Sequence, residues 1–251
     1  MRTDEGAEFA DQVAAVTGAG NGIGRAAALL LARRGAFVIC IDRDERALTA
    51  LSAEIEAAGG GASPVTGDVT REETFTQVRT IAEDRFGRLD CLANVAGVWE
   101  TRPLADMTID AWRRLFEINV ESVLLSIQAL TPLLKKSANP RIVNVSATDG
   151  YRGSATMPHY AAAKAAVVNL TRSAAQTLAG EAILVNCVAP GAIATERATE
   201  DAWLEERRKL VPLRRLGTPE DVAELIAYLG SRRNTFTTGA VVPVNGGLYM
   251  P

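Results

Sequence analysis

A short apolar run that breaks into a cluster of glycines lies near the start of the chain and limits what it can fold into. The run Val13–Val16 is typical of a strand buried on both faces, and Gly18, Gly22 and Gly24 follow it. A strongly apolar helical stretch then begins at Arg25. Strand, glycine turn and helix in this order present backbone N–H groups and a helix N-terminus to a phosphate. The stretch therefore predicts a phosphate-binding turn, with an ordinary flexible turn as the alternative.

Strands and helices alternate along the rest of the chain. We expect a second buried strand at 36–41 and further strands at 62–66, 89–95, 141–146, 182–188 and 240–244. We expect helices at 44–57, 70–86, 108–134 and 160–179, and one that begins at Thr218, with Thr70 and Glu73 forming a capping box. This alternation predicts a Rossmann-type doubly wound α/β fold, a parallel sheet of about seven strands with helices on both faces. No linker divides the chain, so residues 1–251 are predicted to form a single dinucleotide-binding and catalytic domain.

Composition narrows the class of partner. The formal net charge of −3 gives no electrostatic footprint for nucleic acid or for an anionic membrane. The polar start and the absence of a long apolar run predict a cytoplasmic protein without a membrane segment. Cys40, Cys91 and Cys187 each lie in an apolar run, so we expect buried free thiols. No metal-ligand spacing is present, and no metal site is predicted.

Tyr160 and Lys164 are four residues apart and so share a face of the helix expected at 160–179. A tyrosine titrates near ~10, too high for acid–base work at neutral pH. An ammonium at about 5 Å stabilises the phenolate by roughly 3 kcal/mol at an effective dielectric of 20, about two pKa units. The spacing therefore predicts a tyrosine able to exchange a proton with an alcohol or ketone, with a solvated surface pair as the alternative.

Taken together, these motifs resemble the short-chain dehydrogenase/reductase family. The resemblance covers nearly the whole chain, in order and at the family's spacing. The residues that carry it are Thr17–Gly24, Asp68 and Val69, Asn94–Gly97, Asn119, Ser146, Tyr160 with Lys164, and Pro190 with Gly191. The resemblance implies hydride transfer between a nicotinamide coenzyme and a secondary alcohol or ketone, and a homotetramer.

The resemblance also implies roles for individual residues. Tyr160 is the expected general acid/base, Ser146 polarises the substrate oxygen, Lys164 lowers the pKa of Tyr160 and holds the nicotinamide ribose, and Asn119 holds a water that relays protons to Lys164. The expected coenzyme-binding residues are Gly18, Asn21, Gly22, Ile23, Gly24, Asp42, Arg43, Asp68, Val69, Asn94, Ala96, Gly97, Tyr160, Lys164, Pro190, Gly191, Ile193 and Thr195.

Asp42 favours NAD over NADP. It lies 18 positions after Gly24, at the end of the second expected strand, where a carboxylate accepts hydrogen bonds from the adenosine ribose hydroxyls and repels a 2′-phosphate. Asn21 also favours NAD, because family members that use NADP often carry a basic residue at this position. Arg43 favours NADP, since its guanidinium can reach a 2′-phosphate.

Two other functions remain open. One is an NADP-dependent reductase of a carrier-bound 3-oxoacyl group, and the other is a nucleotide-sensing regulator without turnover. We expect substrate specificity to lie in 98–103, in 147–159 and in a substrate loop at about 192–213. The polar residues of these segments suggest a polar substrate, and they are Arg102, Asp149, Arg152, Glu196 and Arg197. Trp99 and Trp203 are candidate walls of the site, with core or interface packing as the alternative. His159 is expected to make a structural hydrogen bond, with contact to the substrate as the alternative.

Overall fold

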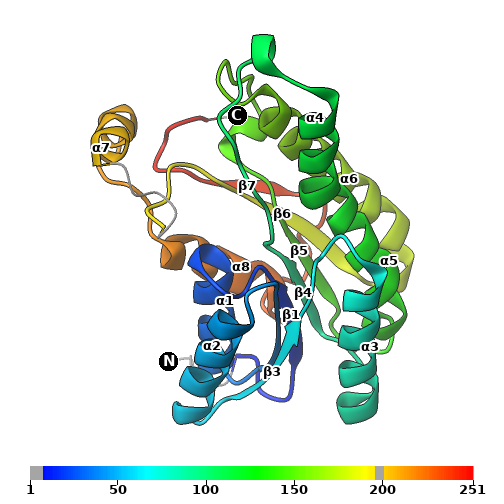
Figure 1. Ribbon diagram of the computed structural model, residues 1–251. Coiled ribbons are helices and arrows are strands. Elements are labelled where there is room, and N and C mark those ends of the chain that lie inside the picture. Colours follow the sequence, from blue (N-terminus) through cyan, green and yellow to red (C-terminus); the bar gives the residue numbers. More distant parts are fainter. Residues whose placement is uncertain (1–7, 196–200, 251) are drawn as a thin grey trace.

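Seven parallel strands form one sheet in the computed structural model, which describes residues 8–195 and 201–250, the last range without the side chains of 201–204. The order across the sheet is β3-β2-β1-β4-β5-β6-β7 (Figure 1). The strands are β1 Val13–Thr17, β2 Phe37–Asp42, β3 Gly61–Thr66, β4 Cys91–Asn94, β5 Arg141–Val145, β6 Leu184–Pro190 and β7 Val241–Val244. The doubly wound α/β fold predicted from the sequence is confirmed.

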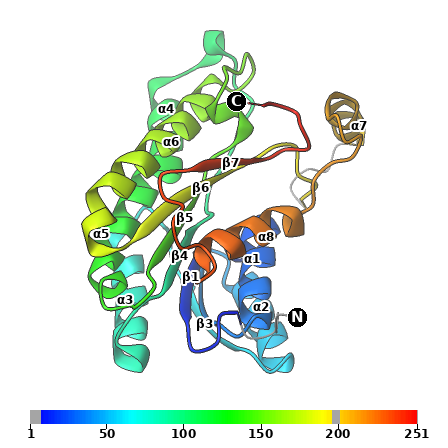
Figure 2. The same cartoon turned by 180° about the vertical axis from the view of Figure 1, so that it is seen from behind.

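Helices cover both faces of the sheet (Figures 1 and 2). One face carries α1 (Gly22–Arg33), α2 (Glu45–Ala57) and α8 (Pro219–Gly230). The other carries α3 (Glu72–Phe86), α4 (Ile109–Phe116), α5 (Ser122–Leu134) and α6 (Pro158–Leu178). The helix α7 (Asp201–Leu210) stands away from the sheet. Short 3-10 turns lie at Leu104–Asp106, Thr148–Gly150 and Ala179–Glu181.

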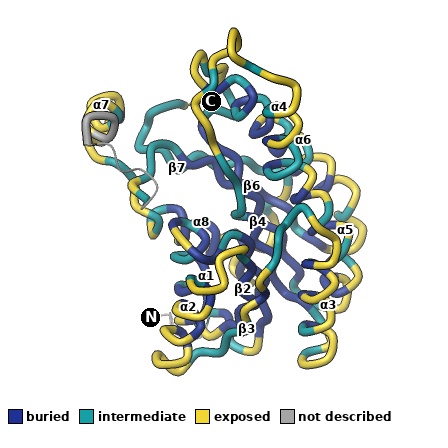
Figure 3. The backbone as a smooth tube through the Cα atoms, in the orientation of Figure 1, coloured by how far each residue is buried: buried dark blue, intermediate teal, exposed yellow. Residues whose placement is uncertain are grey.

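The inner strands β1, β4, β5 and β6 are buried because helices cover them from both sides, whereas most residues of the edge strands β3 and β7 are half-buried or exposed (Figure 3). All five residues of β1 are buried. Successive side chains of a strand point to opposite faces, so its residues divide between two cores. Leu31 and Ile226 pack in the core under α1 and α8, and Phe75 and Leu130 pack in the core under α3 and α5.

The strand order reverses between β1 and β4. From β1 the chain builds outward through β2 to β3, then returns to place β4 on the other side of β1. In open parallel sheets, ligands bind at such a switch point, beyond the carboxyl ends of the strands. The carboxyl ends of β1 and β4 are Thr17 and Asn94, which lie side by side in the register.

The helix expected at 108–134 contains an irregularity. It begins after Thr108, whose hydroxyl accepts a hydrogen bond from the N–H of Ala111, and it ends at Leu134, as expected. However, residues Glu117–Glu121 form a π-helical turn between α4 and α5. Such insertions occur most often at functional sites, and Asn119 is the middle residue of this one.

One of the two expected capping interactions forms. Thr218 caps α8, and its hydroxyl accepts from the N–H of Asp221 while the Asp221 carboxylate accepts from the N–H of Thr218. The capping box predicted for Thr70 is wrong, because α3 begins after Arg71, and the hydroxyl of Thr70 donates to Asp68 instead. Among the described residues, no helix is both long and apolar enough to cross a membrane.

Candidate active site

A cavity of about 980 Å³ lies at the carboxyl edge of the sheet, at the switch point. The predicted site residues that line it are Gly18, Asn21, Gly22, Ile23, Gly24, Asp42, Arg43, Asp68, Val69, Ala96, Gly97, Asn119, Ser146, Tyr160, Lys164, Pro190, Gly191, Ile193 and Thr195. These residues come from loops far apart in the sequence, and the fold brings them to one cavity.

The turn between β1 and α1 is built so that only glycine fits at two of its positions. A Cβ atom on Gly24 would lie 2.0 Å from the carbonyl oxygen of Gly18. A Cβ on Gly18, whose φ is +69°, would lie 2.8 Å from the Cα of Ala96 on the neighbouring loop. The close approach leaves the N-terminus of α1 facing the cavity, where its N–H groups and dipole favour a phosphate.

Asp42 is held in place at the end of β2 by two backbone groups. Its Oδ2 accepts from the N–H of Gly20 at 2.9 Å, and its Oδ1 accepts from the N–H of Asp44 at 3.1 Å. A carboxylate oxygen has lone pairs left after one such bond. The Asp42 carboxylate is therefore fixed against the glycine turn, in the lining of the cavity, with acceptor capacity remaining for a ligand.

Asp68 is stabilised as a carboxylate at the next loop. Burial opposes its ionisation, but hydrogen bonds from the N–H and hydroxyl of Thr70 and the charge of Arg114 outweigh burial and lower the pKa of Asp68. Arg114 Nη2 lies 3.7 Å from Asp68 Oδ2. Arg114, from α4, also lines the cavity, although no motif in the sequence predicts it there. A contact between two elements this far apart in the chain leaves no local pattern in the sequence.

Asn94 does not line the cavity, contrary to its predicted coenzyme contact. Its side chain is buried and belongs to a polar network within the core. Its Nδ2 donates to Asn144 Oδ1 at 2.9 Å, and its Oδ1 accepts from the Ser126 hydroxyl at 2.7 Å. Asn144 in turn donates to Thr171 on α6. The side-chain amide of Asn94 is therefore occupied in joining β4 to β5 and α5.

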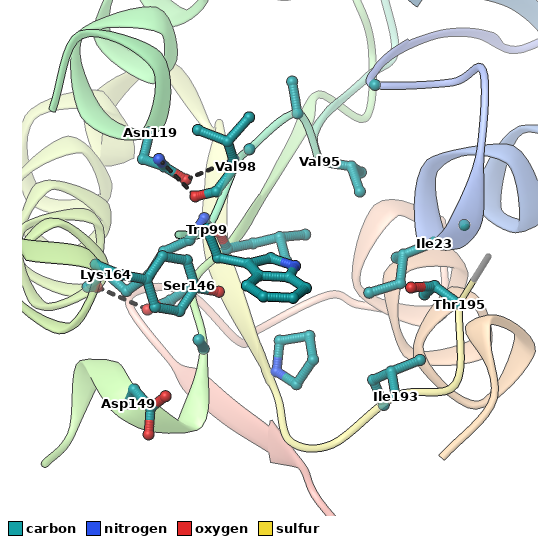
Figure 4. A pocket seen from close by; sticks show the side chains of 18 of the residues that line it. Ile23, Val95, Val98, Trp99, Asn119, Ser146, Asp149, Lys164, Ile193 and Thr195 are labelled. Atoms are coloured by element: carbon teal, nitrogen blue, oxygen red, sulfur yellow. Dashed lines mark hydrogen bonds between the residues drawn. The ribbon is translucent and has the colours of Figure 1, made fainter. Parts of the chain in front are cut away.

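The π-turn aims Asn119 at the loop that follows β4. Asn119 is fully buried, and its Nδ2 donates to the carbonyl oxygens of Val98 and Leu115, each at 3.0 Å. Its Oδ1 accepts from the N–H of Val98 at 3.3 Å (Figure 4). A Cβ on Gly97 would lie 2.7 Å from this Oδ1 and 3.2 Å from Lys164 Nζ. Asn119 and Lys164 therefore converge on the backbone of Gly97.

Pro158 begins α6 and places Tyr160 in its first turn, with Lys164 one turn later. The Nζ of Lys164 lies 5.8 Å from the centre of the Tyr160 ring and donates to the carbonyl oxygen of Val145 at 3.0 Å. Ser146 follows β5, and its hydroxyl donates to the carbonyl oxygen of Lys164 at 2.6 Å. The phenol, hydroxyl and ammonium of the three predicted residues thus come together in one wall of the cavity.

The expected direction of the Tyr160 pKa is wrong for the protein alone. Burial, and then the negative charge of Asp149, raise the pKa of Tyr160 above its ordinary value. Burial also lowers the pKa of Lys164 to about 8. The prediction counted the attraction between a fixed cation and a phenolate but left out the desolvation of both groups. At neutral pH the phenol of Tyr160 therefore keeps its proton in the protein alone.

The segments predicted to set specificity contribute further residues to the lining. Val98, Trp99 and Met157 are apolar members, and in the view of Figure 4 Trp99 is drawn between the Ser146 side and the Ile193 side. Asp149 and Arg152 are polar members. The α7 helix adds Glu206, Arg207 and Leu210 to the lining. The C-terminal segment adds Leu248, which no motif in the sequence predicted.

His159 lies in the first turn of α6 and is buried, but it does not line the cavity. Neither of its ring nitrogens has a hydrogen-bond partner among the described residues. The structural hydrogen bond expected for it is therefore not found. Burial lowers the pKa of His159.

Three other predictions concern residues away from His159. Glu196, Arg197 and the side chain of Trp203 lie outside the described residues. The thiols of Cys40, Cys91 and Cys187 are free and buried, as expected.

Comparison with known proteins identifies this arrangement. A family model described as enoyl-(acyl carrier protein) reductase matches residues 18–249. A short-chain type dehydrogenase/reductase from Mycobacterium marinum superposes with a TM-score of 0.92 at 31% identity, covering 97% of this chain and 98% of that one. The chain belongs to the short-chain dehydrogenase/reductase family. It is therefore an oxidoreductase of a family that uses a nicotinamide coenzyme and acts on alcohol and carbonyl groups.

Two relatives of this dehydrogenase/reductase show how the family varies. Cis-4-hydroxycyclohexanecarboxylate dehydrogenase from Sinomonas cyclohexanicum is 42% identical over 248 residues, which is 96% of this chain and 98% of the relative. The 3-oxoacyl-(acyl-carrier-protein) reductase of Thermotoga maritima is 37% identical over 242 residues, or 95% and 98% of the two chains. Proteins of that second name recur among the similar sequences, in Synechocystis and Vibrio cholerae for example.

The cavity fits a nicotinamide dinucleotide. The turn at Gly18–Gly24 leaves no room for side chains where a pyrophosphate approaches, and Asp42 and Asp68 lie at the ends of the two strands beyond it. In such a complex the glycine turn would hold the pyrophosphate, Asp42 the adenosine ribose, and the wall with Tyr160 and Lys164 the nicotinamide end.

Proposed function

We propose that this protein transfers a hydride between NAD(H) and a secondary alcohol or ketone, with Tyr160 as general acid/base. The observation that carries the proposal is the convergence of the Ser146 hydroxyl, the Tyr160 phenol and the Lys164 ammonium in one wall of the cavity. The family membership supports the reaction class.

Each of the three side chains has a distinct task. In reduction, Tyr160 donates its proton to the developing alkoxide, and the raised pKa of Tyr160 keeps that proton available at neutral pH. The Ser146 hydroxyl rotates from the Lys164 carbonyl to donate to the substrate oxygen and polarise the carbonyl. The bound coenzyme supplies or accepts the hydride.

Lys164 and Asn119 support Tyr160. The ammonium of Lys164, held by the Val145 carbonyl, favours the phenolate that oxidation of an alcohol requires. It is also placed to hold the nicotinamide ribose. Asn119 fixes the loop at Gly97 and Val98 next to Lys164. We assign it the water that passes protons between Lys164 and solvent.

Asp42 supports NAD as the coenzyme. Its carboxylate is anchored by Gly20 and Asp44 and cannot turn away from a 2′-phosphate. A unit charge at about 5 Å costs roughly 3 kcal/mol at an effective dielectric of 20, more than a hundredfold in affinity. Arg43 also lines the cavity and would soften this penalty.

A second candidate is an NADP-dependent 3-oxoacyl-carrier-protein reductase. The names of several relatives favour it, and they support this candidate better than they support the first. The structure favours the first candidate at Asp42, where a phosphate would meet a fixed negative charge. Turnover with NADPH and a 3-oxoacyl thioester, against turnover with NAD and a simple secondary alcohol, separates the two.

Replacing Tyr160 by phenylalanine tests the proposed chemistry. We expect kcat to fall by at least ~10³ while coenzyme affinity changes little, because the hydroxyl faces the substrate. The assay follows the absorbance of the reduced nicotinamide over polyols, hydroxy acids and cyclic alcohols. Tyr228→Phe, at a half-exposed tyrosine on α8, is the matched control.

Turnover close to wild type in Tyr160→Phe would overturn the assignment of the proton-transfer group. A wild-type protein that binds the coenzyme and oxidises or reduces none of the substrates would instead favour a nucleotide-sensing regulator.

A further inference from the structure

Asp149 places a carboxylate in the substrate half of the cavity, and the proposed proton transfer does not use it. It lies on the turn Thr148–Gly150, three residues after Ser146. A Cβ on Gly150 would lie 2.7 Å from the Ser146 Oγ and 2.9 Å from the Lys164 carbonyl oxygen, so this turn packs directly against both residues. The position of Asp149 is thereby fixed relative to the reacting group.

A negative charge at this place works against the oxidation of an alcohol. It adds to the effect of burial in raising the pKa of Tyr160, which makes the phenolate needed for oxidation harder to form. The Asp149 side chain is 16% exposed, so it also loses hydration. Because the Asp149 carboxylate both hinders phenolate formation and loses hydration, we expect it to serve another function, such as binding part of the substrate.

Arg152 forms an ion pair with Asp149 in the lining of the cavity. Its Nε donates to Asp149 Oδ1 at 3.1 Å, and its side chain is 37% exposed and lines the same cavity. This single bond uses one of the five N–H donors of a guanidinium and one of about four acceptor sites of a carboxylate. The pair therefore offers both donors and acceptors to a ligand while remaining neutral as a whole.

The ligand that suits such a pair is a hydroxyl group. A hydroxyl donates one hydrogen bond and accepts others, so it can donate to Asp149 and accept from Arg152 together. A carboxylate would be attracted by Arg152 but repelled by Asp149, and an ammonium the reverse, so neither charge gains a net attraction from the neutral pair. Val98, Trp99 and Met157 line the cavity with apolar surface that suits the carbon skeleton.

We propose that Asp149 and Arg152 bind a second hydroxyl of the substrate, on a carbon next to the one that is oxidised or reduced. The preferred substrates are then compact vicinal diols and the matching hydroxyketones. This inference rests on the proposed function and names its substrate class. A carrier-bound 3-oxoacyl group has no hydroxyl next to its keto carbon, so the inference also opposes the second candidate.

The test compares two alcohols that share a ring and differ in one hydroxyl, trans-1,2-cyclohexanediol and cyclohexanol. Calorimetric titration of each into the protein saturated with NADH gives their affinities. We expect the diol to bind about 10- to 100-fold more tightly, the worth of a hydrogen bond to a charged group. Asp149→Asn and Asp149→Ala should reduce this ratio at least about fivefold. Asp84→Asn, at an exposed carboxylate on α3, should keep it.

Equal affinities for the two alcohols in the wild type, or an unchanged ratio in both Asp149 variants, would overturn the inference. Tighter binding of 4-hydroxycyclohexanecarboxylate than of the diol, lost in Arg152→Gln, would also overturn it and assign Arg152 to a carboxylate. Because the titration measures binding, it judges the inference by itself. Failure of the protein to oxidise any alcohol would instead count against the proposed function.

Discussion

At the scale of single residues, the sequence indicated which side chains lie next to each other but not the pKa values that these side chains have in the fold. Tyr160 and Lys164 are one helical turn apart, which the spacing alone predicts. Their pKa values depend on how deeply other elements bury them, and the pKa of Tyr160 depends also on Asp149, which approaches from a different loop. The hydrogen bonds of Asn94 were likewise not predictable from the sequence. Its amide bonds Asn144 and Ser126, and these contacts exist only in the folded core.

Lys164 gives a prediction about stability and pH. Burial lowers its pKa to about 8, against ~10.4 in an unfolded chain. Below pH 8 both states are protonated, and the folded state bears the full cost of the buried cation, about 3 kcal/mol. Between pH 8 and about 10.4 the unfolded state binds more protons, so this contribution to the free energy of unfolding rises with pH. Above that range both states are neutral.

Urea unfolding of the protein and of Lys164→Met at pH 7.5 and pH 10 measures this effect. The free energy of unfolding of the wild type minus that of the variant should increase by about 2 kcal/mol between the two pH values. The buried cysteines, whose pKa values are raised by burial, lower stability in alkali in both proteins. The effects of Cys40 and Cys91 cancel in the difference, and Cys187, whose thiol interacts with the charge of Lys164, is changed to alanine in both proteins. A difference that stays constant with pH would contradict the assigned Lys164 pKa.

At the scale of elements, most strands and helices followed from apolar patterns and cap residues, and the failures have physical causes. The pattern at 108–134 is continuous, so nothing in it marks the π-turn that aims Asn119. Thr70 and Glu73 have the spacing of a capping box, but the backbone N–H of Thr70, which the Glu73 carboxylate would accept from in such a box, donates to Asp68 Oδ1 instead. A carboxylate two residues away therefore competes with Glu73 for the same N–H.

Thr218→Ala tests the capping box of α8. The change removes the hydroxyl that accepts from the Asp221 N–H, and we expect the free energy of unfolding to fall by about 1 kcal/mol. Thr80→Ala on α3 is the control, because its exposed hydroxyl bonds only the carbonyl of Thr76 within the helix. Chemical denaturation of both variants gives the two values. Equal losses in the two variants would contradict the cap.

At the scale of the whole molecule, the sheet order explains why distant motifs form one site. Parallel strands with helical crossovers carry all their carboxyl ends to one edge, and the reversal between β1 and β4 opens the cavity there. The alternation of elements was enough to predict this edge. Arg114 and Leu248 line the cavity without a motif, since their positions are set only by how α4 and the C-terminal segment pack.

Assembly is a second property of the whole molecule. We propose a homotetramer with one interface on the α6 face, where Ala165 is exposed, and another at 239–251, of which residue 251 lies outside the described residues. Light scattering at micromolar concentration should give a four-chain mass. Ala165→Arg should reduce it by placing a charge in the interface, and Ala53→Arg on the exposed face of α2 should not. A monomer mass for the wild type would reject the proposal.

The choice between NAD and NADP tests whether Asp42 reads the adenosine ribose of the coenzyme. The measurement is kcat/KM for NAD and for NADP with one secondary alcohol, in the wild type, Asp42→Asn and Asp42→Ala, with Asp84→Asn as the control. We expect the wild type to prefer NAD by about 100-fold or more. Both Asp42 variants should gain in relative use of NADP, while the control keeps the wild-type ratio. Equal values for the two coenzymes in the wild type, or no relative gain for NADP in the Asp42 variants, would contradict this role of Asp42.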